Sequence, residues 1–125
     1  MFLGTHLLLY SRNPEADRAF FRDVLELPAI DAGHNWLIFA LPPAEMALHP
    51  TQNPQESTAD TPAAGDVYLM CHDLDSTMAT LAAKGVACGE VHQARWGAVT
   101  TIPLPGGGKL GLYQPRHPLA IQVSS

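Results

Sequence analysis

The same order of predicted elements occurs in both halves of this sequence, and that repeat limits the possible folds more than any other feature. In the first half, an apolar run of strand length at residues 5–11 precedes a helix pattern at 13–27. Strand patterns follow at 29–30, 35–41 and 45–49. Short apolar runs around one segment of helical periodicity are typical of a β-strand, an α-helix and further strands. The first half is therefore predicted to form one βαβββ module.

The second half repeats this order. Residues 66–71 form an apolar run, and a segment follows in which apolar residues share one helical face. Strand patterns then occur at 86–88, 98–102 and 110–113, the last two joined by a glycine-rich turn at 105–108. Consecutive glycines provide the permissive dihedral angles that a tight hairpin requires. Two modules with the same order of elements indicate a duplicated unit.

Both predicted helices carry start and stop signals. Asn13 is a preferred N-cap residue, Pro14 fits the first helical position, and Pro28 stops the helix. Asp73 is the corresponding cap in the second half, and Gly85 suits the residue after the helix end. These signals place one helix early in each module.

A polar segment rich in proline separates the two modules at residues 50–64. This composition is typical of a linker or a surface excursion. A chain of 125 residues is too short to build two independent cores. We therefore expect a single domain over residues 1–125, with modules at about 3–49 and 65–115.

Composition and charge exclude several classes of partner. The net charge is −5 and the seven Lys and Arg residues are scattered, so no basic surface is available for nucleic acid. No apolar run approaches the ~20 residues that cross a bilayer, and the first residues lack the basic region of a signal peptide. Cys71 and Cys88 lack metal-binding spacing and are typical of reduced thiols. We expect a cytoplasmic protein that binds neither nucleic acid nor membrane.

Several stretches resemble one known superfamily in their order and spacing. Residues 13–25 resemble its first helix, with the paired aromatics Phe20 and Phe21. Residues 67–85 resemble its second-module strand and helix, and 104–115 resemble its closing hairpin. The sequence thus looks similar to the vicinal oxygen chelate superfamily of glyoxalases, bleomycin-resistance proteins and extradiol dioxygenases. The resemblance implies an α+β fold in which two βαβββ modules form a curled mixed sheet around a cleft.

The resemblance also implies four metal-ligand positions at the cleft floor, which here are His6, Ala47, Asp66 and Gly111. His6 and Asp66 have side chains that bind divalent ions, whereas Ala47 and Gly111 have none. Two ligands fall short of the three protein ligands of a usual catalytic site. We therefore expect no tightly bound cofactor. The alternative is a divalent metal (Fe, Zn, Mn or Ni) held by His6 and Asp66, with His6 as a catalytic residue of a lyase, isomerase or extradiol-type dioxygenase.

His49 offers a third ligand, since two histidines and one carboxylate form the facial triad of non-haem iron oxygenases. It lies two residues beyond Ala47, which is about 6.6 Å along a strand. At that distance it misses a metal ion level with His6 unless the strand bulges. The sequence therefore favours His49 as a pocket-lining residue. A general-base enzyme that uses His6 or His49 without metal is a further possibility.

Without a metal, the same cleft is predicted to bind an aromatic or amphipathic small molecule. Such pockets combine apolar and aromatic walls with a few polar anchors. Residues on the predicted strands or at their entries are the candidates for this lining: His6, Leu8, Tyr10, Trp36, Ala47, His49, Trp96 and Tyr113. The resemblance also implies a homodimer, because modules of this superfamily pair edge to edge within one chain or between two.

Overall fold

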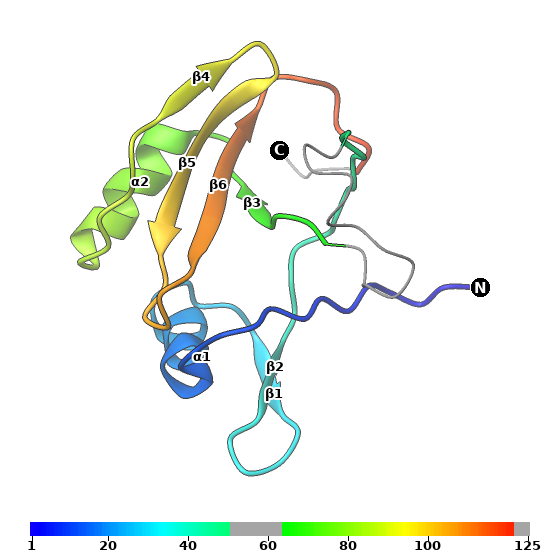
Figure 1. Cartoon of the computed structure of the whole chain (residues 1–125), viewed down its shortest axis with the longest axis vertical. Coiled ribbons are helices and arrows are strands. Elements are labelled where there is room, and N and C mark those ends of the chain that lie inside the picture. The colour runs from blue at the N-terminus through cyan, green and yellow to red at the C-terminus, as the bar shows by residue number, and fades with distance from the viewer. Residues whose placement is uncertain (51–63, 122–125) are drawn as a thin grey trace.

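The computed structural model describes residues 1–50 and 64–121 and has two helices and two separate sheets (Figure 1). The helices are α1 (Pro14–Asp23) and α2 (Leu74–Ala83), and neither is long or apolar enough to span a membrane. The strands are β1 (Ala29–Asp31), β2 (Leu37–Phe39), β3 (Tyr68–Met70), β4 (His92–Ala94), β5 (Gly97–Pro103) and β6 (Lys109–Pro115). The α+β class expected from the sequence is confirmed. The expected linker at 50–64 lies almost entirely outside the described residues.

The second half of the chain forms a four-stranded mixed sheet in the order β3, β6, β5, β4. β3 runs parallel to β6, whereas β5 pairs antiparallel with both β6 and β4. The turn between β5 and β6 closes through a hydrogen bond from the Gly107 N–H to the Leu104 carbonyl. Gly107 has a φ of 99°, a conformation that favours glycine. The hairpin predicted at this glycine-rich turn is confirmed.

The hydrophobic core lies between α2 and one face of this sheet. Its buried apolar residues all belong to the second half of the chain: Leu74, Leu81, Val86, Ala98, Ile102, Leu110 and Leu112. From α1, Phe20, Phe21 and Val24 pack against this core but stay half-buried. The second module therefore has a core of its own, and the first module packs against its edge.

Both helices begin where the sequence predicts. The Asn13 side chain accepts a hydrogen bond from an N–H of the first turn of α1, and Asp73 accepts two from the first turn of α2. These bonds satisfy amide groups that have no partner within the helix. α1 ends at Asp23, earlier than predicted, because the chain then turns through a positive φ of 56° at Glu26.

Hydrogen bonds join the two modules at both ends of α1. The buried Asp17 carboxylate accepts bonds from the Ser11 hydroxyl (2.5 Å) and from the Gly106 N–H in the β5–β6 turn (2.7 Å). At the other end, the Lys84 ammonium donates to the Glu26 carboxylate at 2.8 Å. The Lys84–Glu26 pair is solvent-exposed, so water and salt screen it. The bond from the Gly106 N–H to Asp17 is the stronger tie between the modules, and the Ser11 hydroxyl holds the carboxylate in place for it.

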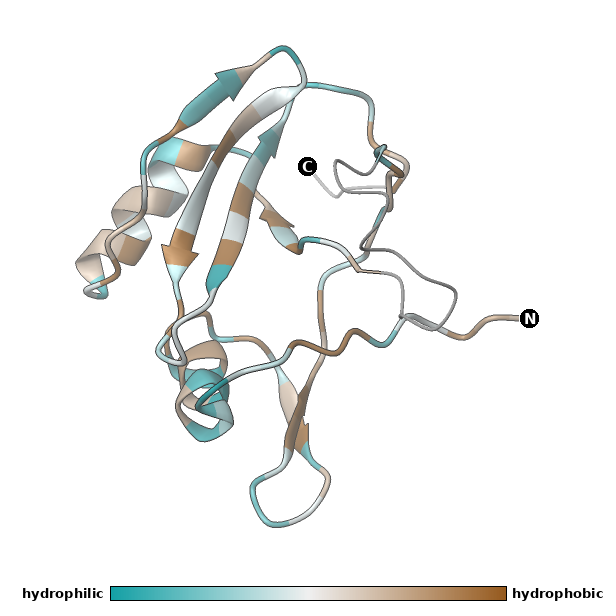
Figure 2. Cartoon of the chain, viewed as in Figure 1, coloured by the Kyte–Doolittle hydropathy of each residue, from teal (hydrophilic) through white to brown (hydrophobic). Residues whose placement is uncertain are grey.

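The strands expected at 5–11 and 45–49 are not formed, which corrects the prediction from the sequence. Neither segment pairs with another described strand. Leu8 is 70% exposed and Leu48 is 88% exposed, and Figure 2 shows the apolar N-terminal segment running apart from the four-stranded sheet. A strand persists only where a neighbour takes up its backbone hydrogen bonds. Within the described residues these two segments have no such neighbour.

The strand expected at 86–88 is also absent, and β4 lies further along the chain. Val86 instead packs into the core behind α2. A two-residue connection joins β4 to β5, so that Ala94 pairs with Gly97 and His92 with Val99. The other predicted strands are present, although several are shorter than their apolar runs.

We predict that Asp17→Ala destabilises the protein by roughly 1.5–3 kcal/mol, the usual range for a hydrogen bond to a charged group. The substitution leaves the Gly106 N–H without its partner. Urea unfolding of the two proteins measures the difference. Asp23→Ala is the control because Asp23 is an exposed acid of the same helix, and it should leave the midpoint nearly unchanged. Equal effects of the two substitutions would contradict the role given to Asp17.

Candidate functional site

The sheet face opposite α2 is the only face of the second module that its own helix does not cover among the described residues. Alternation along β6 directs Leu110, Leu112 and Gln114 to the face that α2 covers. Leu110 and Leu112 enter the core, and the side-chain carbonyl of Gln114 accepts a hydrogen bond from the Leu74 N–H. The strand register assigns the remaining positions to the opposite face: Tyr68, Met70, Val99, Thr101, Gly111 and Tyr113. This second face is the place where the module can meet a ligand.

Four ring side chains gather around this face, and we call them the aromatic cluster: Tyr68, Trp96, Tyr113 and His117. Tyr113 is their centre. Its ring centroid lies 5.4 Å from that of Trp96 and 6.2 Å from that of Tyr68, both in edge-to-face geometry. The His117 ring lies 5.7 Å away on a tilted plane. Edge-to-face contacts of this kind are favourable and fix the rings relative to one another.

The Tyr113 hydroxyl is held in place as a hydrogen-bond donor. It donates to the Trp96 carbonyl at 3.0 Å. Partial burial raises the pKa of this phenol, and the nearby Glu45 carboxylate raises it further. The hydroxyl therefore keeps its proton at neutral pH, and its oxygen retains lone pairs that can accept a bond from a ligand.

Glu45 and His117 form a polar edge beside the cluster. The His117 Nδ1 lies 2.8 Å from the Pro118 carbonyl, which can only accept, so Nδ1 carries the hydrogen. The other ring nitrogen, Nε2, faces the Glu45 carboxylate at 4.0 Å. Glu45 also accepts a hydrogen bond from the Ala120 N–H at 3.0 Å. This edge joins the first module to the segment after β6.

The four positions implied as metal ligands do not fit a metal ion here. The Tyr68 ring covers Gly111 so closely that a side chain at 111 would overlap it. Ala47 has no donor atom, and His6 and Asp66 are both exposed. Within residues 1–50 and 64–121, no three His, Cys, Asp or Glu side chains gather as a metal site.

The predicted site residues fall in three places. Trp96 and Tyr113 come together in the aromatic cluster. Trp36 lies on the β1–β2 hairpin, in contact with the Arg18 guanidinium. The loop of this hairpin is at the opposite end of the molecule from the β4–β5 turn (Figure 1). The others are exposed on the two segments that precede α1 and follow β2: His6, Leu8, Tyr10, Ala47 and His49.

Three residues of the site were not among the sequence-based candidates. Tyr68 was detectable, because it lies two residues after Asp66 and so shares its strand face. Glu45 and His117 gave no such signal, since each lies outside a regular element and they meet only through the fold.

Comparison with known proteins bears on the fold. No protein-family model and no curated protein sequence matches this sequence. Among solved structures, TnmS3, an antibiotic-binding protein from Streptomyces sp. CB03234, matches with a TM-score of 0.59 at 20% identity over 92% of this chain and 99% of its own. A lactoylglutathione lyase from Agrobacterium tumefaciens matches with a TM-score of 0.55 at 18% identity, over 85% of this chain and 88% of its own. A member of the glyoxalase/bleomycin resistance protein/dioxygenase superfamily from Sphaerobacter thermophilus matches with a TM-score of 0.53 at 18% identity, over 86% of this chain and 91% of its own.

This chain has the vicinal oxygen chelate fold. The resemblance noted in the sequence is confirmed at the level of the fold. Within the vicinal oxygen chelate fold, α1 with β1 and β2 belongs to one module, and α2 with β3 to β6 belongs to the other. Since one matching structure is named a binding protein and another a lyase, the fold leaves the chemistry open.

We predict that Gly111→Ala destabilises the protein by about 1–3 kcal/mol, because the new methyl group must displace the Tyr68 ring. In a Tyr68→Ala background the same substitution should cost much less. Urea unfolding of the single and double variants measures this coupling. Gly108→Ala is the matched control, since a methyl group there meets open space. An equal cost of Gly111→Ala in both backgrounds would show that Tyr68 does not occupy this position.

Proposed function

We propose that this protein binds an aromatic or amphipathic small molecule against the aromatic cluster, without a tightly bound metal ion. The observation that carries the proposal is the set of rings on the uncovered sheet face. Trp96 remains 51% exposed although it contacts Tyr113. Rings that are fixed by one another but open on one side offer a stacking surface at little cost in side-chain entropy. A contiguous exposed apolar patch often marks an interaction site or a ligand-binding groove.

The polar groups around the cluster suit a ligand with both an apolar body and a polar end. The Tyr113 oxygen accepts, and the Glu45 carboxylate accepts as well. A ligand hydroxyl or amine that points toward Glu45 would find a partly buried acceptor beside His117. Small-molecule sites usually combine an apolar wall with a few polar anchors of this kind.

The absence of ligating atoms at Ala47 and Gly111 supports binding without metal. The Tyr68 ring above Gly111 extends the aromatic surface into the place that a metal ligand would need. TnmS3, which has the same fold, is an antibiotic-binding protein. The alternative remains a metal-dependent lyase, isomerase or dioxygenase that uses His6, and the experiment below separates the two.

We also infer that two copies of the chain associate. The segments at 1–10 and 41–49 expose apolar side chains, among them Leu8 and Leu48. A further apolar hollow of about 270 Å³ lies on the β1–β2 hairpin, where Ile30 and Ile38 pair and are exposed. Unpaired apolar segments are suited to pairing with the same elements of a second copy. A cytoplasmic location accords with the two free thiols, Cys71 and Cys88.

We predict that aromatic and quinone-like compounds raise the melting temperature equally with and without a chelator. Trp96→Ala should weaken binding about tenfold, the effect of losing one aromatic contact of 1–1.5 kcal/mol. With uncharged compounds, Trp36→Ala is the control, because Trp36 is exposed but lies outside the cluster. Calorimetric titration of the best compound measures the affinities. Binding that requires Fe, Zn, Mn or Ni and is lost in His6→Ala would instead support the metal-dependent enzyme.

We predict that the protein sediments at micromolar concentration as a species of twice 13.4 kDa. Leu8→Glu combined with Leu48→Glu should convert it to a monomer, because each adds a charge to an exposed apolar segment. Ala79→Glu, on the exposed side of α2, is the control and should leave the mass unchanged. A wild-type protein that sediments only at 13.4 kDa would refute the dimer.

A further inference from the structure

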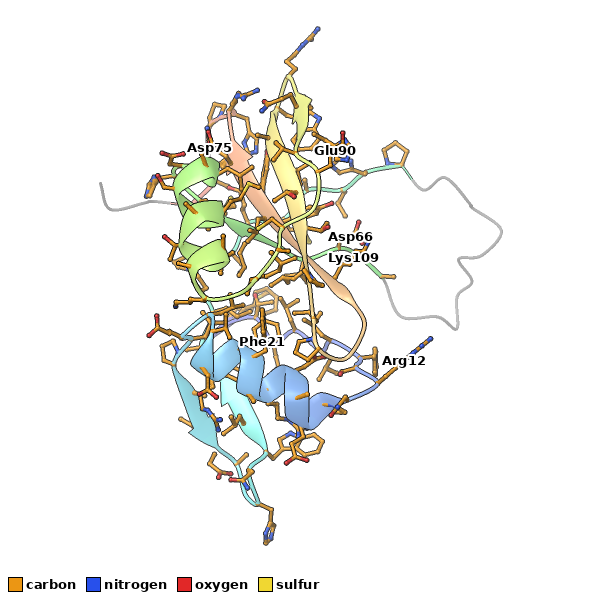
Figure 3. The ribbon with its side chains drawn as sticks, turned by 90° about the vertical axis from the view of Figure 1, so that its left-hand side faces the viewer. Arg12, Phe21, Asp66, Asp75, Glu90 and Lys109 are labelled. Atoms are coloured by element: carbon orange, nitrogen blue, oxygen red, sulfur yellow. The ribbon has the colours of Figure 1, made fainter. Side chains whose placement is uncertain are left out.

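A hollow lies between α1 and the loop of the β1–β2 hairpin, and it shares no residue with the aromatic cluster. Its volume is about 360 Å³, within the range of small-molecule sites. α1 contributes Glu15, Arg18 and Arg22, and the hairpin contributes His34, Asn35 and Leu37. Figure 3 shows α1 beside the β1–β2 hairpin, the two elements from which the lining residues come.

Arg18 is held in place by an aromatic ring rather than by an acid. Its guanidinium carbon lies 4.2 Å from the centre of the Trp36 ring, a cation–π contact. Within residues 1–50 and 64–121, no carboxylate lies at ion-pair distance from Arg18. This contact restrains the position of the guanidinium without using its N–H groups, which stay available to another acceptor.

Arg22 adds a second positive charge one helical turn further along α1. Its Nε and Nη2 bind the two oxygens of Asp23 at 2.7 and 2.8 Å, which leaves Nη1 as a donor. This pairing raises the pKa of the guanidinium, so the group stays charged. Glu15 is the one acid that lines the hollow, against two guanidinium groups. Asp23 offsets the charge of Arg22, so Arg18 is the guanidinium of the hollow that has no acid at ion-pair distance within residues 1–50 and 64–121.

The opposite wall is a preformed turn. His34 and Asn35 both have positive φ, 53° and 64°, and the Trp36 N–H donates to the Gly33 carbonyl. These are the features of a type I′ turn, which suits a hairpin. The Asp31 carboxylate accepts from the N–H groups of Gly33 and Asn35 and so fixes the loop. The donor side chains therefore need little reordering when a ligand binds.

We propose that this hollow binds a small organic oxyanion, a phosphate ester or a carboxylate. A planar guanidinium with a free edge matches two oxygens of such a group, and Arg22 and the Asn35 amide supply further donors. The hollow is larger than an inorganic ion requires, and Leu37 provides an apolar wall for the organic part. The proposal is independent of the aromatic cluster, because no residue is shared between the two.

The test follows the fluorescence of Trp36, the tryptophan that contacts Arg18. In Trp96→Phe protein, Trp36 is the single tryptophan and lies beside Arg18. Phenyl phosphate, benzoate and inorganic phosphate are titrated at constant ionic strength, with sodium chloride as the blank. We expect a saturable change in Trp36 fluorescence with phenyl phosphate. Binding of phenyl phosphate alone would assign phosphate esters, and similar binding of benzoate would include carboxylates.

Three variants that each lose one positive charge test whether phenyl phosphate binds in this hollow. Arg18→Gln should raise the dissociation constant about tenfold or more, the usual effect of losing a charge-assisted pair. Arg22→Gln, a substitution at an exposed position that should not disturb folding, should raise it less, since Asp23 already uses part of that guanidinium. Arg12→Gln removes the same charge from a side chain that points away from the hairpin and should have no effect (Figure 3). A linear response equal to that of sodium chloride, or equal affinities of all three variants and their parent, would overturn the proposal.

Discussion

The packing of α2 against one face of the β5–β6 hairpin is the contact on which the rest of the structure depends. Ile102 and Leu112 are 0% and 2% exposed, and they meet Leu74 and Leu81 from the helix. Burial of this many apolar side chains is the main favourable term in a small domain. Because α2 covers that face, the alternating residues of the same strands are turned outward. The outward position of Tyr68 and Tyr113 in the aromatic cluster thus follows from the packing of the core on the other face of the same strands.

The first module depends on the second in a different way. It adds no fully buried apolar residue of its own and is joined through polar contacts, above all from Asp17 to the Gly106 N–H. Phe20 and Phe21 cover the edge of the core without completing it. This asymmetry leaves the segments before α1 and after β2 without strand partners in the described chain. The proposed dimer would supply hydrogen bonds and apolar cover to these two segments, which have neither from the described part of the chain.

The sequence predicts the elements whose signals are local and misses those that need a neighbour. The caps at Asn13 and Asp73 and the turn before β6 depend on residues close in sequence, so they were predictable. The segments at 5–11 and 45–49 have the composition of strands, but a strand also requires a pairing partner. Of the predicted lining residues, Tyr113 lies on β6 and Trp96 in the connection between β4 and β5, and the two rings meet. Trp36 lies beside Arg18 after the type I′ turn, a position that depends on the hairpin geometry and not on the apolar run alone.

The central claim is that the rings around Tyr113 bind a small molecule without metal, and the indole signal of Trp96 tests it most directly. In Trp36→Phe protein, Trp96 gives the single indole N–H resonance, because the chain has two tryptophans. An aromatic compound that stacks on the cluster should shift this resonance progressively to saturation in the presence of a chelator, through its ring current and the altered contact with Tyr113. The account would be contradicted if a compound that binds the protein left the Trp96 resonance unmoved, or moved it only after a divalent metal was added.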